Sequence, residues 1–220
     1  MPKEPFKAFI ERTTPIGKLA RLYREKQLKK KYLTWQQTGG KGPMPNYGKQ
    51  RVVKEYLKKF GLKTFIETGT YKGKMVYAVL PYVDTIYSIE LDPVYCRKAQ
   101  DKFAGYSNIH IIQGQSGDVL PELMANINEP CLFWLDAHYS GGSTAKGPQD
   151  TPIMQELKCL LNHAQADKHV FLIDDARCFV GKDDYPTIEK LREYILAQKT
   201  NWHFEVENDI IKTHASRGII

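Results

Sequence analysis

Acidic residues at the ends of apolar runs are the side chains of this chain best suited to do chemistry. Four of five short apolar runs end at or next to an acid: Glu67, Glu90, Asp136 and Asp174, the last followed directly by Asp175. An acid at a strand end often does no more than cap the next helix. In an open α/β sheet, however, ligands bind outside the carboxyl ends of the strands. The pattern therefore indicates an acid-lined cleft along one edge of a sheet.

Three of these acids, Asp136, Asp174 and Asp175, form what we call the acidic triad. They end adjacent runs, so we expect them to lie on one side of the cleft, where they repel unless a cation or a proton compensates. Oxygen ligands favour Mg²⁺, Ca²⁺ or Mn²⁺ over zinc. Such an ion can hold a diol and lower the pKa of a hydroxyl. The plainer alternative is that Asp175 caps the following segment and Asp136 positions a substrate.

His138, two residues after Asp136, is the best candidate for a general base. The ordinary pKa of histidine, ~6.5, suits proton abstraction near neutral pH. A loop histidine that orients an acid or binds substrate is an equally good interpretation. The loop 139–150 contains three glycines and is long enough to act as a lid or to contact substrate. Arg177 is either a grip for an anionic acceptor or a surface salt bridge.

The stretch Thr64–Gly73 (TFIETGTYKG) indicates a strand, a tight turn and the start of a helix. Its glycines permit positive φ and a close approach of the backbone to a ligand. Their spacing is G-x-x-x-G, which differs from the G-x-G-x-x-G of dinucleotide-binding proteins. This spacing counts against an NAD-dependent Rossmann enzyme, although such enzymes share the strand, the glycine turn and a distal acid.

Apolar runs alternate with helical patterns from residue 63 onward, which predicts βαβ units and a parallel sheet. The predicted fold is α/β, a three-layer Rossmann-like sheet that is mostly parallel and ends in an antiparallel hairpin. The predicted strands are 63–68, 85–90, 109–113, 131–136 and 169–174, followed by a hairpin of 203–206 and 210–213. The predicted helices are 74–80, 93–103, 117–125, 151–164 and 185–199.

These motifs, in this order, resemble the class I S-adenosylmethionine-dependent methyltransferases over about residues 64–177. ETGTYKG is similar to the first motif of the family, and Glu90 stands where the family binds both ribose hydroxyls. GQS (114–116) lies where the family contacts adenine, with Gln115 in place of the usual acid. The resemblance assigns to the cofactor Glu67, Thr68, Gly69, Thr70, Gly73, Glu90, Leu91, Gln115, Ser116 and Asp136. The cleft acids also suit the positive charges of this cofactor, and Glu67 is placed for its ammonium.

The pairing of LDAH with IDD resembles the metal-dependent, macrocin-type sugar O-methyltransferases. This resemblance implies that the acidic triad binds a divalent metal, with Mg²⁺ first among the candidates. It implies O-methylation of a small-molecule or carbohydrate acceptor, with Asp136 and His138 as catalytic residues. RNA is the alternative acceptor.

Charge is distributed unevenly along the 220 residues. Residues 1–63 contain 17 Lys and Arg against 4 Asp and Glu, whereas the whole chain carries a net charge of +7. We therefore expect a basic helical extension with its loop (1–48), followed by a methyltransferase domain (49–220). A basic segment suggests an anionic partner, RNA included, or a solvated helix that docks on the acidic body. Homo-oligomer formation is left open.

Local patterns predict how the basic region is built. Apolar residues recur at helical spacing over 16–35, including the aromatic Tyr23, Tyr32 and Trp35, which argues for core packing rather than RNA contacts. The glycine- and proline-rich segment 38–48 predicts a loop. Asn46 is then expected to cap a helix that Gly61 closes.

Four cysteines without a C-x-x-C pair indicate buried free thiols, foremost at Cys131 and Cys159. No signal peptide or membrane-spanning run is apparent. We therefore expect a cytoplasmic protein.

Overall fold

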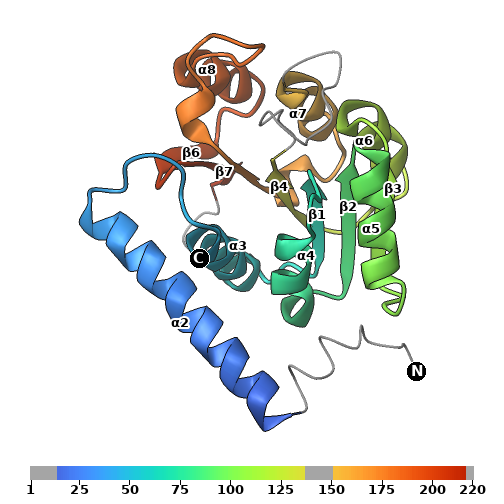
Figure 1. Cartoon of the computed structure of the whole chain (residues 1–220). Coiled ribbons are helices and arrows are strands. Elements are labelled where there is room, and N and C mark those ends of the chain that lie inside the picture. Colours follow the sequence, from blue (N-terminus) through green and yellow to red (C-terminus); the bar gives the residue numbers. More distant parts are fainter. Residues whose placement is uncertain (1–13, 137–150, 217–220) are drawn as a thin grey trace.

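A seven-stranded sheet in the order β3-β2-β1-β4-β5-β7-β6 organises the chain (Figure 1). The computed structural model describes residues 14–136 and 151–216. The strands are β1 (Thr64–Thr68), β2 (Thr85–Glu90), β3 (Ile109–Gln113), β4 (Cys131–Leu135), β5 (Val170–Ile173), β6 (Trp202–Glu207) and β7 (Ile210–Ala215). Each strand lies within two residues of its predicted bounds.

The first five strands are parallel, and β7 is antiparallel to both of its neighbours, β5 and β6. Glu67 of β1 pairs in register with Ser88 of β2 and Trp134 of β4. The carboxyl ends of β1, β2, β4 and β5 therefore meet along one edge of the sheet. The predicted mostly parallel α/β sheet with a C-terminal antiparallel hairpin is confirmed.

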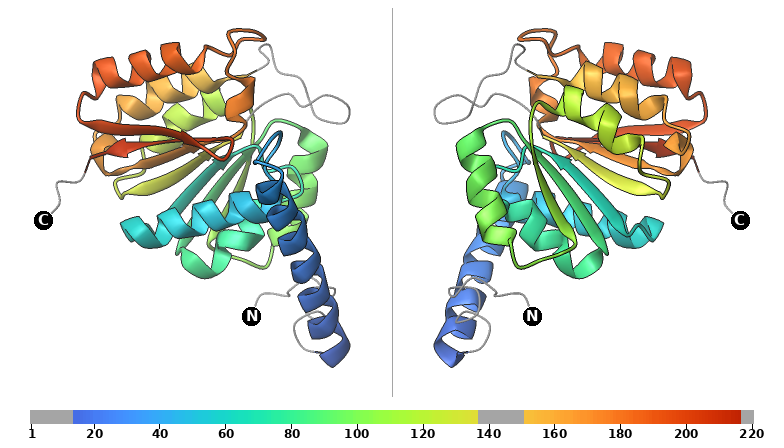
Figure 2. Two further views of the ribbon diagram at one scale, coloured as in Figure 1. Left: turned by 90° about the vertical axis from the view of Figure 1, so that its left-hand side faces the viewer. Right: turned by 90° about the vertical axis from the view of Figure 1, so that its right-hand side faces the viewer.

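Helices cover both faces of the sheet and give it three layers (Figure 2). One face carries α3, α4 and α5, the other carries α6, α7 and α8, and α2 projects away from the body. The helices are α2 (Pro15–Gln37), α3 (Asn46–Phe60), α4 (Lys74–Val79), α5 (Pro93–Phe103), α6 (Ser116–Met124), α7 (Ile153–Leu161) and α8 (Ile188–Gln198), with 3₁₀ turns η1 (Leu80–Tyr82), η2 (Ala166–Lys168) and η3 (Ala176–Cys178).

The central strands are apolar on both faces, because helices cover both. Successive side chains of a strand point to opposite faces. Phe65 and Trp134 therefore pack in the same buried cluster as Leu57 of α3. Ile66 and Phe133 pack on the other face in the same cluster as α7. The sheet is a rigid support for the loops at its carboxyl edge.

The start of α3 differs from the prediction. The helix already includes Asn46, and Pro45 occupies the cap position with no side-chain hydrogen bond. The predicted loop to Gly48 therefore ends at Pro45, and the predicted cap by Asn46 is wrong. Proline satisfies the extended conformation of a cap (φ −59°, ψ 142°) without any polar side chain. Gly61 closes the helix with φ 64°, as predicted.

The buried hydrophobic side chains described for helix α2 lie near its C-terminal end. Tyr32 and Trp35 are buried in the cluster that contains α3, and Tyr32 lies close to the backbone of Gly48. Tyr23 and Leu19 are instead 66% and 71% exposed. Core packing was therefore the correct interpretation for Tyr32 and Trp35. It was wrong for Tyr23, because that part of the helix projects from the body.

The four cysteines are free thiols. Cys131 in β4 is buried, as predicted, whereas Cys159 on α7 is only partly buried. In the part of the chain that the structure describes, no helix is both long enough and apolar enough to cross a membrane.

Candidate functional site

The glycine turn after β1 folds over the end of β2. The amide of Gly69 donates to the carbonyl of Ile89 at 2.9 Å, and both Gly69 and Gly73 have positive φ, at 94° and 61°. A Cβ on Gly73 would lie 2.6 Å from Cε2 of Phe103. This position therefore requires glycine on two counts: the positive φ and the close packing against α5.

Glu67 is buried beneath this turn. Its Oε1 accepts a hydrogen bond from Ser88 Oγ at 2.6 Å, and Ser88 Oγ lies 2.5 Å from Thr70 Oγ1. Because the hydroxyl of Ser88 donates to Glu67, the hydroxyl of Thr70 donates to Ser88. Burial raises the pKa of Glu67 to about 8, against the opposing effect of the Ser88 hydrogen bond. The turn thus holds a carboxyl that is mostly neutral at pH 7 and that a nearby cation would ionise.

Glu90 closes β2 next to the same turn. Its carboxylate accepts the amide of Tyr71 at 2.6 Å and the amide of Asp92 at 2.9 Å. Burial raises the pKa of Glu90, and these two backbone hydrogen bonds oppose the rise. Leu91 follows, and its carbonyl accepts from the side chain of Gln113 at 3.2 Å. The position predicted for ribose is therefore a fixed carboxylate at the strand end.

The segment predicted to contact adenine begins α6. Gln115 is the cap residue of the helix and Ser116 is its first residue. The Oγ atom of Ser116 is buried and interacts with the carboxyl of Glu156, and this interaction lowers the pKa of that carboxyl. The structure places Glu67, Thr68, Gly69, Thr70, Gly73, Glu90, Leu91, Gln115, Ser116 and Asp136 at or beside the carboxyl ends of β1 to β4.

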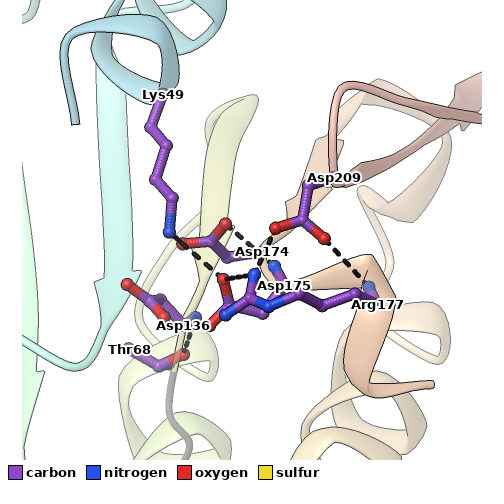
Figure 3. A network of polar contacts seen from close by, with 7 residues as sticks. All are labelled: Lys49, Thr68, Asp136, Asp174, Asp175, Arg177 and Asp209. Carbon is purple, nitrogen blue, oxygen red and sulfur yellow. Dashed lines mark hydrogen bonds and ion pairs between the residues drawn. The ribbon is translucent and has the colours of Figure 1, made fainter. Parts of the chain in front are cut away.

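The acidic triad converges between β4 and β5, as predicted from the sequence (Figure 3). One carboxylate oxygen from each of its three members lies within 4.8 Å of the other two. The amide of Asp136 is held by the carbonyl and the hydroxyl of Thr68, at 3.1 and 3.3 Å. Asp175 adopts a left-handed conformation with φ 56°. A non-glycine residue in this conformation is uncommon and is often found at functional sites.

Two basic side chains already contact the acidic triad. Lys49, in the first turn of α3, forms an ion pair with Asp174 and lies 3.2 Å from Asp175 Oδ1. Arg177 lies 2.6 Å from the same Asp175 oxygen and also pairs with Asp209, in the turn between β6 and β7 (Figure 3). Arg177 is thus engaged in ion pairs within the chain, which is the plainer of its two predicted roles.

The triad offers suitable ligands for a hard divalent ion, but a lysine side chain already binds one of its carboxylates. The triad offers three oxygen ligands from one small region, as Mg²⁺ or Mn²⁺ requires. Burial raises the pKa of Asp174, and neighbouring Asp136 adds to this effect. Lys49 opposes that rise, and its ammonium binds Oδ2 of Asp174. The residues therefore suit the ion, provided that the Lys49 ammonium withdraws.

A small pocket beside the triad contains a further acid, Glu156 of α7. The pocket is lined by Leu135, Asp136, Thr151, Ile153, Glu156, Ile173, Asp174, Phe179 and Tyr185. Glu156 is 1% exposed, and its carboxyl interacts with the hydroxyls of Ser116 and Thr68, which oppose the effect of burial on its pKa. Burial raises the pKa of Glu156 to about 7.

The sequence pattern did not identify Lys49 or Glu156 as site residues. Lys49 stands 125 positions before Asp174, amid other basic residues, and no local pattern marks it. Glu156 was inside the predicted helix 151–164. Its position near the N-terminus of that helix was the only signal that it faces the strand ends. His138 and the loop 139–150 lie outside the described residues.

Comparison with solved structures identifies the fold. The chain superposes on an O-methyltransferase from Bacillus cereus in complex with S-adenosylhomocysteine, with a TM-score of 0.54, 13% identity and coverage of 77% of this chain and 81% of that one. The S-adenosylhomocysteine-bound methyltransferase PaMTH1 from Podospora anserina gives 0.55 at 16% identity, covering 83% and 86%. The O-methyltransferase TomG from Streptomyces achromogenes, which is involved in tomaymycin synthesis and was solved with S-adenosylmethionine, gives 0.53 at 16% identity, covering 87% and 89%.

The chain therefore has the fold of the class I S-adenosylmethionine-dependent methyltransferases. No protein-family model matches the sequence. No curated protein matches it either. The antiparallel β7 between β5 and β6 also separates this sheet from the Rossmann order 3-2-1-4-5-6 of dinucleotide-binding enzymes. The fold gives no support to the NAD alternative.

Proposed function

We propose that the protein is an S-adenosylmethionine-dependent O-methyltransferase that acts on a hydroxyl of a small molecule or carbohydrate with the help of a divalent metal. The observation that carries this proposal is the convergence of the acidic triad beside the glycine turn, at one edge of a sheet with the methyltransferase fold. A methyl donor bound over the turn and an acceptor bound over the triad would face each other across that edge.

The cofactor half of the proposal rests on Glu67 and Glu90. Glu67 would take the cofactor ammonium, since a buried carboxyl with a raised pKa gains most from a cation. Glu90 would accept the ribose hydroxyls, which must share its carboxylate with the amides of Tyr71 and Asp92. Gln115 and Ser116, at the start of α6, would lie beside the adenine.

The acceptor half rests on the acidic triad. Asp136, Asp174 and Asp175 would hold the metal, which, when bound, lowers the pKa of an acceptor hydroxyl. Asp136, fixed by two hydrogen bonds from its amide to Thr68, would keep the acceptor oxygen in line with the methyl group. His138 is proposed as the base that takes the hydroxyl proton, and Asp136 is the second candidate for that role.

A tritiated-methyl transfer screen tests this proposal. Sugars, phenols and RNA are incubated with the protein and labelled S-adenosylmethionine, with and without EDTA. We expect label on a sugar or phenol that EDTA suppresses and added Mg²⁺ or Mn²⁺ restores. His138→Ala should reduce turnover while the affinity for S-adenosylhomocysteine stays constant. Calorimetry that detects NAD binding but no S-adenosylhomocysteine binding would overturn the proposal.

RNA remains a second candidate acceptor because of one observation on α2. This basic helix projects from the body and exposes Tyr23 rather than burying it. An exposed aromatic ring among Lys and Arg side chains can stack on a base. RNA labelling in the same screen, lost when residues 1–45 are deleted, would favour RNA. The exposed apolar residues of α2 also keep a homo-oligomer open, which sedimentation of the full chain tests.

A further inference from the structure

Lys49 reaches the acidic triad from a distant part of the chain (Figure 3). Its ammonium contacts Asp174 Oδ2 and Asp175 Oδ1, the second at 3.2 Å, and the side chain is 13% exposed. Burial opposes a charge on Lys49, but the nearby Asp174, Asp136 and Asp175 outweigh it and raise its pKa above the usual range. Lys49 is therefore a positively charged side chain bound within the acidic triad.

The hydrogen bonds of the triad show what this cation occupies. Oδ1 of Asp174 accepts the amide of Asp175 at 2.8 Å, and Oδ2 accepts from Lys49. Oδ1 of Asp175 accepts from both Lys49 and Arg177, at 3.2 and 2.6 Å. Both oxygens of Asp174 are thus engaged by donors of the chain itself. A divalent ion bound to Oδ2 would lie close to the ammonium, and the two positive charges would repel each other.

We propose that Lys49 and a divalent cation compete for the same carboxylates of the acidic triad, so that Lys49 sets the affinity of the metal site. This competition rests on the divalent-ion part of the proposed function. In the metal-free protein the ammonium balances the buried aspartates, which would otherwise repel one another. When a divalent metal binds, the flexible lysine side chain withdraws, and the metal neutralises the aspartate charges in its place. Arg177 stays in place, because Asp209 anchors it from the other side.

The first turn of α3 is suited to this exchange. Pro45 provides no side-chain cap, and the turn contains no acidic residue that would hold the lysine in another position. Lys49 also stands only four positions after the connection from α2. The ion pairs that the structure gives Lys49 are those with Asp174 and Asp175, so moving its ammonium away breaks contacts with the triad alone.

Binding of Mn²⁺ to the full chain, without cofactor or acceptor, tests the competition. Free Mn²⁺ is measured by electron paramagnetic resonance for the wild type, Lys49→Met, Lys49→Arg and Lys58→Met. Lys49→Met removes the charge but keeps most of the stem, whereas Lys58→Met removes an exposed charge from the same helix. We expect Lys49→Met to bind Mn²⁺ about tenfold more tightly, equivalent to about 1.4 kcal/mol. Lys49→Arg and Lys58→Met should resemble the wild type.

Thermal denaturation provides a second readout. Without metal, Lys49→Met leaves buried aspartates uncompensated and should melt below the wild type. Mn²⁺ should then raise its melting temperature more than that of the wild type. Adding Asp174→Asn to Lys49→Met should abolish both the tighter binding and the larger shift.

Three outcomes would overturn the inference. They are unchanged or weaker Mn²⁺ binding by Lys49→Met, tight binding that survives Asp174→Asn, and no Mn²⁺ binding by any variant. The last result, with S-adenosylhomocysteine still bound, would remove the metal from the proposed function but leave the methyl donor. The first two would remove Lys49 as a competitor and leave the proposed function intact.

Discussion

Under the proposed function, the buried carboxyl of Glu67 should make cofactor affinity depend on pH. If the ionised carboxylate is the form that pairs with the cofactor ammonium, only the ionised fraction of the protein is ready to bind. With a pKa of about 8, that fraction is about one tenth at pH 7 and about one hundredth at pH 6. The apparent dissociation constant varies as the inverse of this fraction. Affinity should therefore rise about tenfold from pH 6 to pH 7.

The rise should end near pH 8. There Glu67 is already half ionised, so a further rise in pH can no more than double the ionised fraction. Below this pH, binding should also release about one proton, because the bound ammonium lowers the pKa of the carboxyl. Burial also raises the pKa of Glu90, so the Glu67→Gln variant is needed to assign both effects to Glu67.

Calorimetric titration with S-adenosylhomocysteine between pH 6 and pH 8, in buffers of different ionisation enthalpy, measures both quantities. Glu67→Gln should bind more weakly at pH 8, with a flat pH profile and no proton release. Glu122→Gln, an exposed change on α6, serves as the matched control and should keep the wild-type profile. A flat profile in the wild type would refute the reasoning, and so would a slope that persists in Glu67→Gln.

Three further changes test the packing around the site. Burial raises the pKa of Glu156 from 4.5 to about 7 in the folded protein. The free energy of unfolding therefore falls as pH rises from about 4.5 to 7, because the unfolded chain ionises this carboxyl more readily. Glu156→Gln should therefore raise the free energy of unfolding by about 3 kcal/mol at pH 8 and leave it unchanged at pH 4, by denaturant titration. Gly48→Ala places a Cβ 2.6 Å from Tyr32 and should lower the free energy of unfolding by about 2 kcal/mol, although alanine is the better helix former. Gly73→Ala combines a positive φ with a clash against Phe103, and should therefore lower the melting temperature. The same change should lower the affinity for S-adenosylhomocysteine by about tenfold or more.

Each of these expectations has a contrary result. Equal stabilisation by Glu156→Gln at pH 4 and pH 8 would show that the carboxyl charge is not the source. A stable Gly48→Ala would mean that α2 can move away from α3 without loss. A Gly73→Ala protein with normal cofactor affinity would remove the turn from the proposed binding site.

Much of the fold could be predicted because its signals are local. Buried parallel strands appear as short apolar runs, and the helices carry their own start and stop residues, such as Asp92 before α5 and Gly61 after α3. The cap at Asn46 failed because a proline conformation replaced a side-chain hydrogen bond. The exposure of Tyr23 could not be predicted, since helical spacing does not show where a helix leaves the body.

The acidic half of the site was predictable for a geometric reason. Parallel strands bring their carboxyl ends to one edge, so acids at those ends converge whatever their distance in sequence. The basic half followed no such rule. Lys49 comes from a helix start, and Arg177 is held by Asp209 of a hairpin turn. Only the packing of α3 and β7 on the sheet brings Lys49 to the triad and Asp209 to Arg177.

The position of β7 has a consequence for how the protein folds. It is the last strand that the structure describes, yet it lies inside the sheet, between β5 and β6. Until β7 docks, β5 presents an open edge, and an unpaired edge strand is a template for aggregation. The turn that carries Asp209 arrives with β7, so the Arg177 ion pair forms in the same step. Closure of the sheet and completion of the polar network around the triad should thus appear as one late kinetic event.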